Sequence, residues 1–277
     1  MKYIYENNGV TISSPELFSV ERTLDCGQCF RFDRDENCVF HGVAFGKYIR
    51  LEEKENGDIF IPNMSKEEFE ERFMSFFALD TDYDEIISSL VFDETVKKSL
   101  ERSAGIRILN QEPWETLCSF IISQNNNIPR IKKIVSSLCE LCGDDVDGCK
   151  MKSFPSAKKV YSLGIDGLAP IKSGFRAKYI ISAAESVVSG KIDFDQLKKT
   201  DYLSAKKQLM EIKGVGPKVA DCVLLFGLGF KEAFPIDVWI KRVISKYYGE
   251  DFTPEYFGKY AGIAQQFLFY NERYVIQ

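Results

Sequence analysis

The sequence predicts an α+β protein in which an N-terminal antiparallel β-sheet domain precedes a mainly α-helical region. Residues 1 to about 60 alternate apolar and polar positions and are rich in aromatic and β-branched residues. From Ser65 onward the apolar spacing changes to three and four residues, which is typical of amphipathic helices. We therefore expect a sheet domain with a flanking helix in residues 1–95 and an all-α region in residues 96–277.

Short runs bounded by turn residues mark the expected strands. They are VTIS, CFRFD, CVFHGVAFG, KYIRLEE and DIFIP. Ser65 and Glu68 have the spacing of a capping box and predict the start of the first helix.

Proline and glycine mark the boundaries of the later helices. Pro113 stands at the first turn of one helix, and an apolar-periodic helix follows Asn127 as far as Gly143. Two further helices are expected to end at Gly190 and Gly214.

Charge is distributed unevenly over the 277 residues, whose net charge is −5. Residues 52–94 contain fourteen Asp and Glu against three Lys and Arg, whereas residues 198–246 contain ten Lys and Arg against five acidic residues. A phosphate backbone responds to such local basic surface, although solvated helix faces explain the charges equally well. No apolar run is long enough for a membrane span, and the N-terminus lacks a signal-peptide pattern, so we expect an intracellular, cytoplasmic protein.

Eight cysteines leave a metal or redox site open. Cys26 and Cys29 form one C-x-x-C pair, Cys139 and Cys142 form another, and Cys149 lies nearby. Ordinary buried or surface thiols are the favoured interpretation, because free cysteine usually behaves as a small hydrophobe. The chain has one histidine, which argues against histidine-based metal or triad chemistry.

The stretch KGVGPKVADC predicts two helices joined by a tight hairpin. Gly214 suits a left-handed position, Gly216 permits close backbone approach, and Pro217 fits the first position of the second helix. The free amides and dipole of that second helix can bind a phosphate without reading bases. Such turns are also often only structural.

Two polar residues near this hairpin carry candidate chemistry. Lys218 lies in the first turn, where the helix dipole and partial burial favour the neutral, nucleophilic amine; an exposed lysine touching phosphate is the alternative. Asp237 follows Pro235 at the N-cap of the next helix, where amides hold the carboxylate ionised; simple capping is the alternative.

Taken together, KGVGPKVADC and PIDVW resemble the helix-hairpin-helix Gly/Pro-Asp signature of the endonuclease III-like DNA glycosylase superfamily. The chain has no C-terminal four-cysteine iron–sulfur pattern, and a β domain precedes its helices. This combination is similar to the 8-oxoguanine DNA glycosylases and the alkyladenine glycosylases. The resemblance implies two helical subdomains with the active site in the cleft between them.

Four further stretches resemble the 8-oxoguanine branch, and the roles below are implied by that resemblance. In CGQCFRF, the carbonyl of Gly27 would accept N7–H of the lesion. In YAGIAQQFLF, Gln265 would read the Watson–Crick edge, and Phe269 would stack on the lesion opposite Cys222.

The other two stretches are implied to contact DNA. In SQNNNIPRI, Asn125 would fill the gap left by the flipped base and Arg130 would contact the orphan cytosine. In GFRAKY, Phe175 would wedge into the stack and Arg176 would also read the cytosine. Phe175 replaces a familiar tyrosine, and Trp239 stands where a histidine is common, so a phosphate contact at that position is in doubt.

The resemblance implies a bifunctional glycosylase and lyase, acting as a monomer on double-stranded DNA that contains 8-oxoguanine, without a metal or organic cofactor. Lys218 would form the Schiff base, with Asp237 stabilising positive charge on the sugar. A glycosylase for alkylated purines and a non-enzymatic helix-hairpin-helix DNA-binding protein remain as alternatives. A C-x-x-C redox protein is remote, because no βαβ pattern surrounds Cys26 and Cys29.

Overall fold

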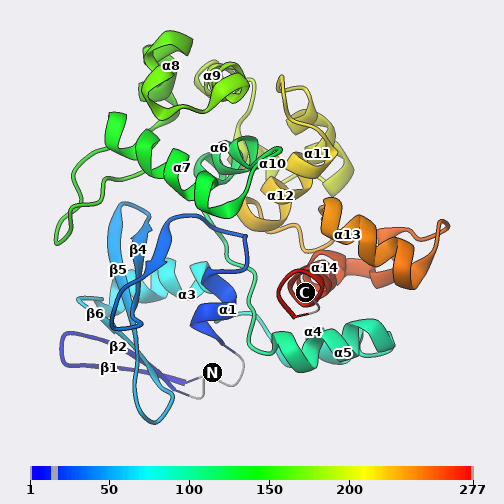
Figure 1. Cartoon of the computed structure of the whole chain (residues 1–277). Helices are drawn as coiled ribbons and strands as arrows, with labels where there is room; N and C mark the ends of the chain where they lie inside the picture. Colours follow the sequence, from blue (N-terminus) through cyan, green and yellow to red (C-terminus); the bar gives the residue numbers. More distant parts are fainter. Residues whose placement is uncertain (1, 14–17, 276–277) are drawn as a thin grey trace. The chain divides into compact units, whose positions relative to one another are not determined.

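A computed structural model describes residues 2–13 and 18–275 of the chain (Figure 1). The chain forms two compact units, each built from separate stretches of sequence. Unit 1 comprises residues 1–28, 50–110 and 230–277, and unit 2 comprises residues 29–49 and 111–229. The predicted boundary at residue 95 cuts the sequence once, into residues 1–95 and 96–277. It stays a prediction.

Six antiparallel strands confirm the predicted N-terminal sheet. They are β1 (Lys2–Glu6), β2 (Gly9–Ser13), β3 (Phe32–Arg34), β4 (Phe40–Ala44), β5 (Lys47–Glu53) and β6 (Ile59–Pro62), in the order β1-β2-β6-β5-β4-β3. In β5 the period-two pattern buries Ile49 and Leu51, which explains why this strand matches the predicted run KYIRLEE. Strand β1 pairs with β2 and was not among the predicted strands.

The helical elements of unit 1 are α1, which lies between β2 and β3, a group that follows β6, and a third group in residues 230–277. They are α1 (Val20–Leu24), α2 (Lys66–Glu68), η2 (Phe69–Phe73), α3 (Met74–Phe76), α4 (Tyr83–Leu90), α5 (Glu94–Ser103), α13 (Val238–Val243), η5 (Ile244–Tyr248), η6 (Pro254–Tyr260), α14 (Ala261–Tyr270) and η7 (Asn271–Val275). The predicted capping box is present: Ser65 Oγ accepts from the Glu68 amide, and the Glu68 carboxylate accepts from the Ser65 amide.

Unit 2 contains the other helices. They are α6 (Pro113–Ser123), α7 (Ile128–Cys142), α8 (Ala157–Gly167), η3 (Ala169–Ile171), η4 (Gly174–Arg176), α9 (Ala177–Val188), α10 (Phe194–Leu197), α11 (Tyr202–Met210) and α12 (Pro217–Gly227). The predicted boundaries at Pro113, Asn127 and Gly143 agree with α6 and α7, because proline occupies a first turn and Asn127 caps α7.

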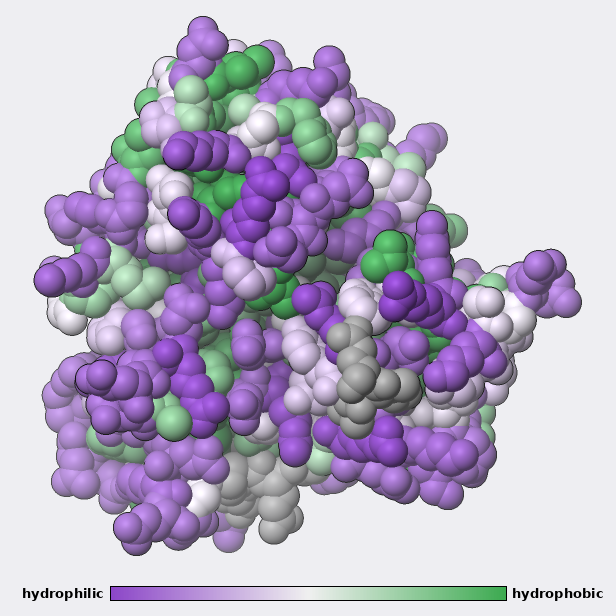
Figure 2. Space-filling view, in the orientation of Figure 1, coloured by the Kyte–Doolittle hydropathy of each residue, from purple (hydrophilic) through white to green (hydrophobic). Residues whose placement is uncertain are grey.

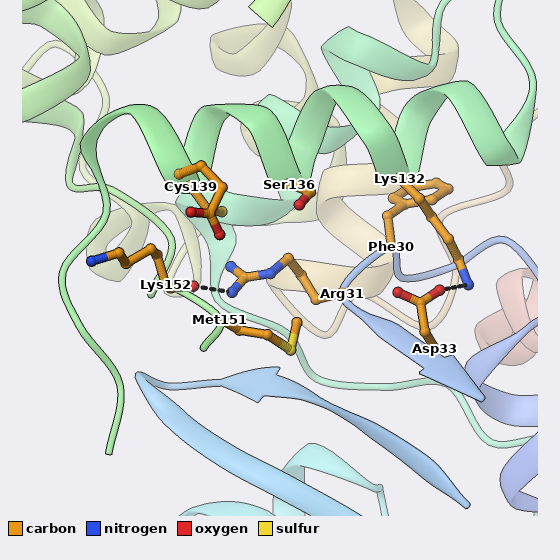
Figure 3. A pocket seen from close by; sticks show the side chains of 9 residues that line it. Phe30, Arg31, Asp33, Lys132, Ser136, Cys139, Met151 and Lys152 are labelled. Carbon is orange, nitrogen blue, oxygen red and sulfur yellow. Dashed lines mark hydrogen bonds and ion pairs between the residues drawn. The ribbon is translucent and has the colours of Figure 1, made fainter. Parts of the chain in front are cut away.

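A small cavity of about 50 Å³ lies in unit 2 between α7, the segment Phe30–Asp33 and residues 151–152 (Figure 3). The Arg31 guanidinium is buried there and donates from Nη2 to the carbonyl of Lys152 at 2.6 Å. Its Nη1 lies 3.5 Å from Glu115 Oε2 and makes no hydrogen bond with the residues that the structure describes. Arg31 and Glu115 therefore form a buried ion pair with incomplete hydrogen bonding.

This pair predicts a pH-dependent stability. Burial, with Arg31 opposing it, raises the pKa of the Glu115 carboxyl from 4.5 to about 7. Between these values the folded protein holds a proton that the unfolded chain has lost, so stability falls as pH rises. Relative to Glu115→Gln, we expect wild type to lose about 3 kcal/mol of unfolding free energy between pH 4.5 and 7.5.

Urea unfolding of both proteins across this pH range measures the difference. Glu140→Gln is the matched control, because Glu140 is exposed at the mouth of the same cavity. A difference between wild type and Glu115→Gln that does not change with pH would contradict the raised pKa.

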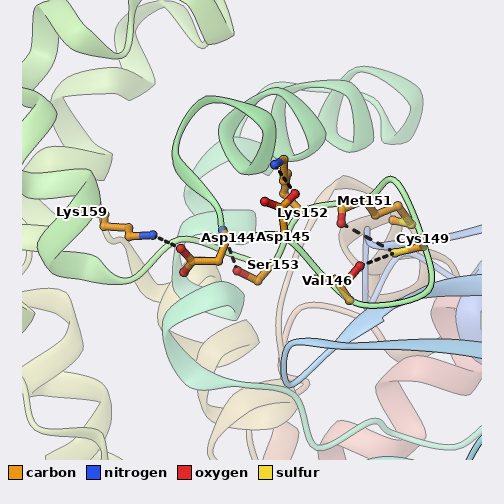
Figure 4. Close-up of polar contacts among 8 residues, drawn as sticks. All are labelled: Asp144, Asp145, Val146, Cys149, Met151, Lys152, Ser153 and Lys159. Carbon is orange, nitrogen blue, oxygen red and sulfur yellow. Dashed lines mark hydrogen bonds and ion pairs between the residues drawn. The ribbon is translucent and has the colours of Figure 1, made fainter.

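The loop between α7 and α8 contains Cys149 and two ion pairs (Figure 4). Ion pairs join Lys159 to Asp144 and Lys152 to Asp145, while Cys149 Sγ lies 3.8 Å and 3.7 Å from the carbonyl oxygens of Val146 and Met151. All eight cysteines are free thiols. Within residues 2–13 and 18–275, no group of three or more His, Cys, Asp or Glu side chains is arranged to hold a metal ion.

No helix in the described part of the chain is both long enough and apolar enough to span a membrane. Figure 2 shows mainly hydrophilic residues on the face that is drawn, interrupted by smaller apolar groups.

Candidate functional site

The predicted hairpin is formed by α11 and α12, which lie side by side in unit 2 (Figure 1). Gly214 has a φ of +91°, and a Cβ at this position would overlap the ring of Tyr179, so both backbone and packing require glycine. Gly216 is the N-cap of α12, and the space beside its Cα is open. Backbone amides at the start of a helix can bind a phosphate, and within the described residues no atom outside the adjoining chain lies within 4 Å of the Cβ position at Gly216.

Helix α11 ends at Met210, four residues before the predicted end at Gly214, because residues 211–214 form turns. A buried carboxylate ties the two helices together. Asp221 of α12 accepts from Tyr202 Oη at 2.7 Å and from Lys206 Nζ at 2.8 Å, both on α11. Burial raises the pKa of Asp221, while the bonds to Lys206 and Tyr202 oppose the increase. The contacts of Asp221 with Tyr202 and Lys206 therefore hold α11 and α12 together.

Lys218 is the second residue of α12 and is half-buried. Its Nζ donates to Ser123 Oγ at 3.3 Å and lies 4.9 Å from the centroid of the Phe120 ring. Both partners belong to α6. Lys218 has no carboxylate partner among the described residues of unit 2. The amine is thus held by a hydroxyl and a ring face rather than by an ion pair.

The three consecutive asparagines after α6 have different roles. Asn127 caps α7 by accepting from the Arg130 amide at 3.0 Å, and Asn126 Nδ2 donates to the carbonyl of Ile122 at 3.0 Å. Asn125 is exposed, has a φ of +47°, and makes no side-chain hydrogen bond with the rest of the described chain. Of the three asparagines, Asn125 is the one predicted to enter DNA, and its exposed side chain is not held by a hydrogen bond to the described chain.

Arg176 binds the backbone of this loop through hydrogen bonds. Its Nε donates to the carbonyl of Gln124 at 2.9 Å, and Nη2 donates to the carbonyls of Gln124 and Asn125. Burial, followed by the charge of nearby Arg130, lowers the pKa of Arg176. Gln124 also connects the loop to the hairpin, because its Nε2 donates to the carbonyl of Gly214 at 3.1 Å.

The predicted wedge residue is available for contact. Phe175 is 48% exposed, and the guanidinium carbon of Arg176 lies 4.5 Å from its ring centroid. Arg130 is likewise exposed, in the first turn of α7. In this structure Arg176 binds backbone carbonyls, whereas Arg130 is the more accessible of the two arginines predicted to read cytosine.

Asp237 belongs to unit 1 and caps α13 as predicted. Its Oδ1 accepts from the amides of Trp239 and Ile240, each at 2.9 Å. The side chain is half-buried. These two hydrogen bonds at the start of α13 fix the direction of the carboxylate.

Two of the predicted base-pocket residues of unit 1, Gln265 and Phe269, lie on α14. Gln265 is 4% exposed, and its Oε1 has no hydrogen-bond partner within the described residues. A buried acceptor without a donor is costly, so this oxygen is suited to a ligand N–H group. Phe269 is 8% exposed, and the guanidinium carbon of Arg273 lies 5.6 Å from its ring centroid.

A buried glutamine fixes the loop that contains Gly27. Gln28 donates from Nε2 to the carbonyls of Thr23 and Arg107, each at 2.8 Å, and accepts from the Leu109 amide at 2.9 Å. Gly27 itself has a φ of +82°. On α14, Gln266 Nε2 donates to the carbonyl of Cys26 at 3.3 Å, which joins the pocket helix to this loop.

The candidate residues are divided between the units. Unit 2 holds Lys218, Cys222, Asn125, Arg130, Phe175, Arg176, Gly214 and Gly216, and unit 1 holds Asp237, Gly27, Gln265 and Phe269. Sequence reasoning missed Ser123 and Phe120. Their contacts with Lys218 join residues almost a hundred positions apart, so no local pattern announces them.

Two known protein families match most of the chain. Residues 10–117 match the family described as 8-oxoguanine DNA glycosylase, N-terminal domain, and residues 118–257 match the HhH-GPD superfamily of base excision DNA repair proteins. The N-glycosylase/DNA lyase of Saccharomyces cerevisiae is 31% identical over 270 residues, which covers 88% of this chain and 72% of the yeast protein.

Two solved structures resemble the whole chain. The Clostridium acetobutylicum 8-oxoguanine glycosylase/lyase, in complex with double-stranded DNA containing cytosine opposite 8-oxoguanine, is 35% identical with a TM-score of 0.91, covering 99% of this chain and 98% of that one. MBOgg1, in complex with a low-affinity DNA ligand, is 37% identical with a TM-score of 0.92, covering 99% of each chain. The chain therefore belongs to the 8-oxoguanine N-glycosylase/DNA lyase family within the HhH-GPD superfamily of base excision DNA repair proteins.

Proposed function

We propose that this chain excises 8-oxoguanine from duplex DNA with Lys218 as the nucleophile and then nicks the strand. The observation that carries the proposal is the half-buried amine at the first turn of α12, which contacts Ser123 and Phe120 and has no carboxylate partner among the described residues of unit 2. The family membership supports the substrate class, and the open backbone at Gly216 supports phosphate binding beside the amine.

Extrusion of the lesion base costs a few kcal/mol of stacking and pairing. Exposed Asn125 and Phe175 would offset this cost by filling the gap and unstacking the neighbouring bases. Arg130 would contact the orphan cytosine, with Arg176 holding the loop and reading the same base. Cytosine is proposed as the opposite base on these contacts.

Four groups would contact the extruded base. The Gly27 carbonyl would accept N7–H, which 8-oxoguanine has and guanine lacks. Gln265 Oε1, a buried acceptor without a partner in the described chain, suits the N–H donors on the Watson–Crick edge. Phe269 would stack on one face of the base and Cys222 would contact the other.

In the chemical step, neutral Lys218 Nζ attacks C1′ and forms the N–C1′ bond. The C1′–N9 bond breaks, and the base leaves with the electron pair and takes up a proton. Asp237 stabilises the positive charge that develops on the sugar and accepts the proton that the amine loses. The C1′–O4′ bond then opens as O4′ takes up the proton held by Asp237, which gives the protonated Schiff base. Loss of a C2′ proton to water breaks the C3′–O3′ bond and expels the 3′ phosphate.

We propose further that the protein works as a monomer in a prokaryotic cytoplasm, without a metal or organic cofactor. The function is tested by base release from duplexes with one 8-oxoguanine opposite cytosine or one 3-methyladenine opposite thymine. Release of 8-oxoguanine supports the proposal. Release of 3-methyladenine alone would favour an alkylpurine glycosylase, and DNA binding without release of either base would favour a non-enzymatic binding protein.

A further inference from the structure

We propose that Ser123 is a positioning residue that orients the Lys218 amine through an uncharged hydrogen-bond acceptor. This inference rests on the proposed function, because it concerns how the nucleophile is kept ready. Ser123 Oγ is the hydrogen-bond partner of Nζ at 3.3 Å, and the Phe120 ring faces the same amine at 4.9 Å. No other role for Ser123 follows from the reaction.

Both partners are themselves held in place. Ser123 Oγ donates its proton to the carbonyl of Phe120 at 2.8 Å, which leaves its lone pairs to accept from Lys218. The Phe120 ring stacks on Phe226, with centroids 5.4 Å apart, and meets Phe30 edge to face at 5.7 Å. The acceptor therefore has a defined direction, and the ring has a defined plane.

The chemistry of this arrangement matters for a nucleophile. A hydroxyl oxygen accepts an N–H bond from an amine or from an ammonium group, and it favours the ammonium form much less than a carboxylate at the same place would. When the amine donates one N–H group to Ser123 Oγ, its lone pair points away from Ser123. Ser123 thus orients Lys218 without placing a negative charge beside the amine.

The decisive variant is Ser123→Asp, which places a carboxylate beside Nζ. We expect the single-turnover rate of 8-oxoguanine release to fall about 100-fold at pH 7, since a close opposite charge shifts protonation by roughly 1–3 pH units. The rate should recover toward the wild-type rate as pH rises to 9.5. Binding of lesion DNA, measured by fluorescence anisotropy, should change much less.

Ser162→Asp is the matched control. Ser162 makes the same kind of bond, from Oγ to the carbonyl of Lys159 at 2.7 Å, but it is exposed on α8. It adds the same charge to the same unit and should leave the pH profile of wild type unchanged. A parallel change in both variants would assign the effect to net charge and overturn the proposal.

Other outcomes are equally decisive. A Ser123→Asp protein that is as active as wild type at pH 7, or that is impaired equally at every pH, would overturn the proposal. Should this variant fail to fold, Ser123→Ala and Ser123→Thr provide the test: alanine should slow release by roughly fivefold to tenfold, and threonine should restore it. Absence of release by wild type would instead refute the proposed function itself.

Discussion

Lys218→Gln is expected to abolish the covalent protein–DNA complex that borohydride traps on a duplex with 8-oxoguanine opposite cytosine. Borohydride reduces a Schiff base to a stable amine, and glutamine has no amine with which to form one. The side chain remains long and polar, so lesion binding should stay within about tenfold of wild type. A denaturing gel measures the trapped band, and anisotropy measures binding.

Lys213→Gln is the control for this prediction. Lys213 is exposed in the segment between α11 and α12, so its replacement removes the same charge close to the hairpin. We expect weaker, less salt-dependent DNA binding from this control but normal trapping, because one fewer lysine neutralises the phosphate backbone. A trapped band with Lys218→Gln would remove Lys218 as the nucleophile and direct attention to another amine.

Asp237→Asn should slow base excision by about two to three orders of magnitude without unfolding the protein. Asparagine caps helices as well as aspartate, and its oxygen can still accept from the amides of Trp239 and Ile240. The substitution therefore removes the charge and keeps the cap. Single-turnover release of 8-oxoguanine measures the rate, and thermal unfolding checks the fold.

Asp193→Asn provides the matched comparison. Asp193 caps α10 through the amides of Asp195 and Gln196, at 2.9 Å and 3.1 Å, which is the same bonding pattern. It should retain wild-type excision. Full activity of Asp237→Asn would exclude the carboxylate from the mechanism and leave it as a helix cap.

Local patterns predicted the elements whose cause is local. Strand β5 follows from strict alternation, and the capping box at Ser65 and the prolines at the starts of α6 and α12 are each set by one turn of chain. Strand β1 was missed, because it belongs to the sheet through pairing with β2 rather than through a strong pattern of its own.

The candidate site was predictable to the extent that it resembles a known family. Motifs indicated Lys218 and Asp237 as candidate residues. No motif indicated the residue that accepts a hydrogen bond from the Lys218 amine. Ser123 meets Lys218 only through the packing of α6 against α12, which no local pattern encodes. The interleaving of the two units escaped prediction for the same reason, since it depends on contacts between distant stretches.

The interleaved units have a consequence for biosynthesis. Unit 2 is complete once residue 229 has left the ribosome, whereas unit 1 still lacks residues 230–277. Domains usually fold in order of synthesis, starting from the N-terminus. Unit 1, which contains the N-terminal residues, must wait for residues 230–277, so the nascent chain carries an incomplete unit 1 while unit 2 already has all its residues.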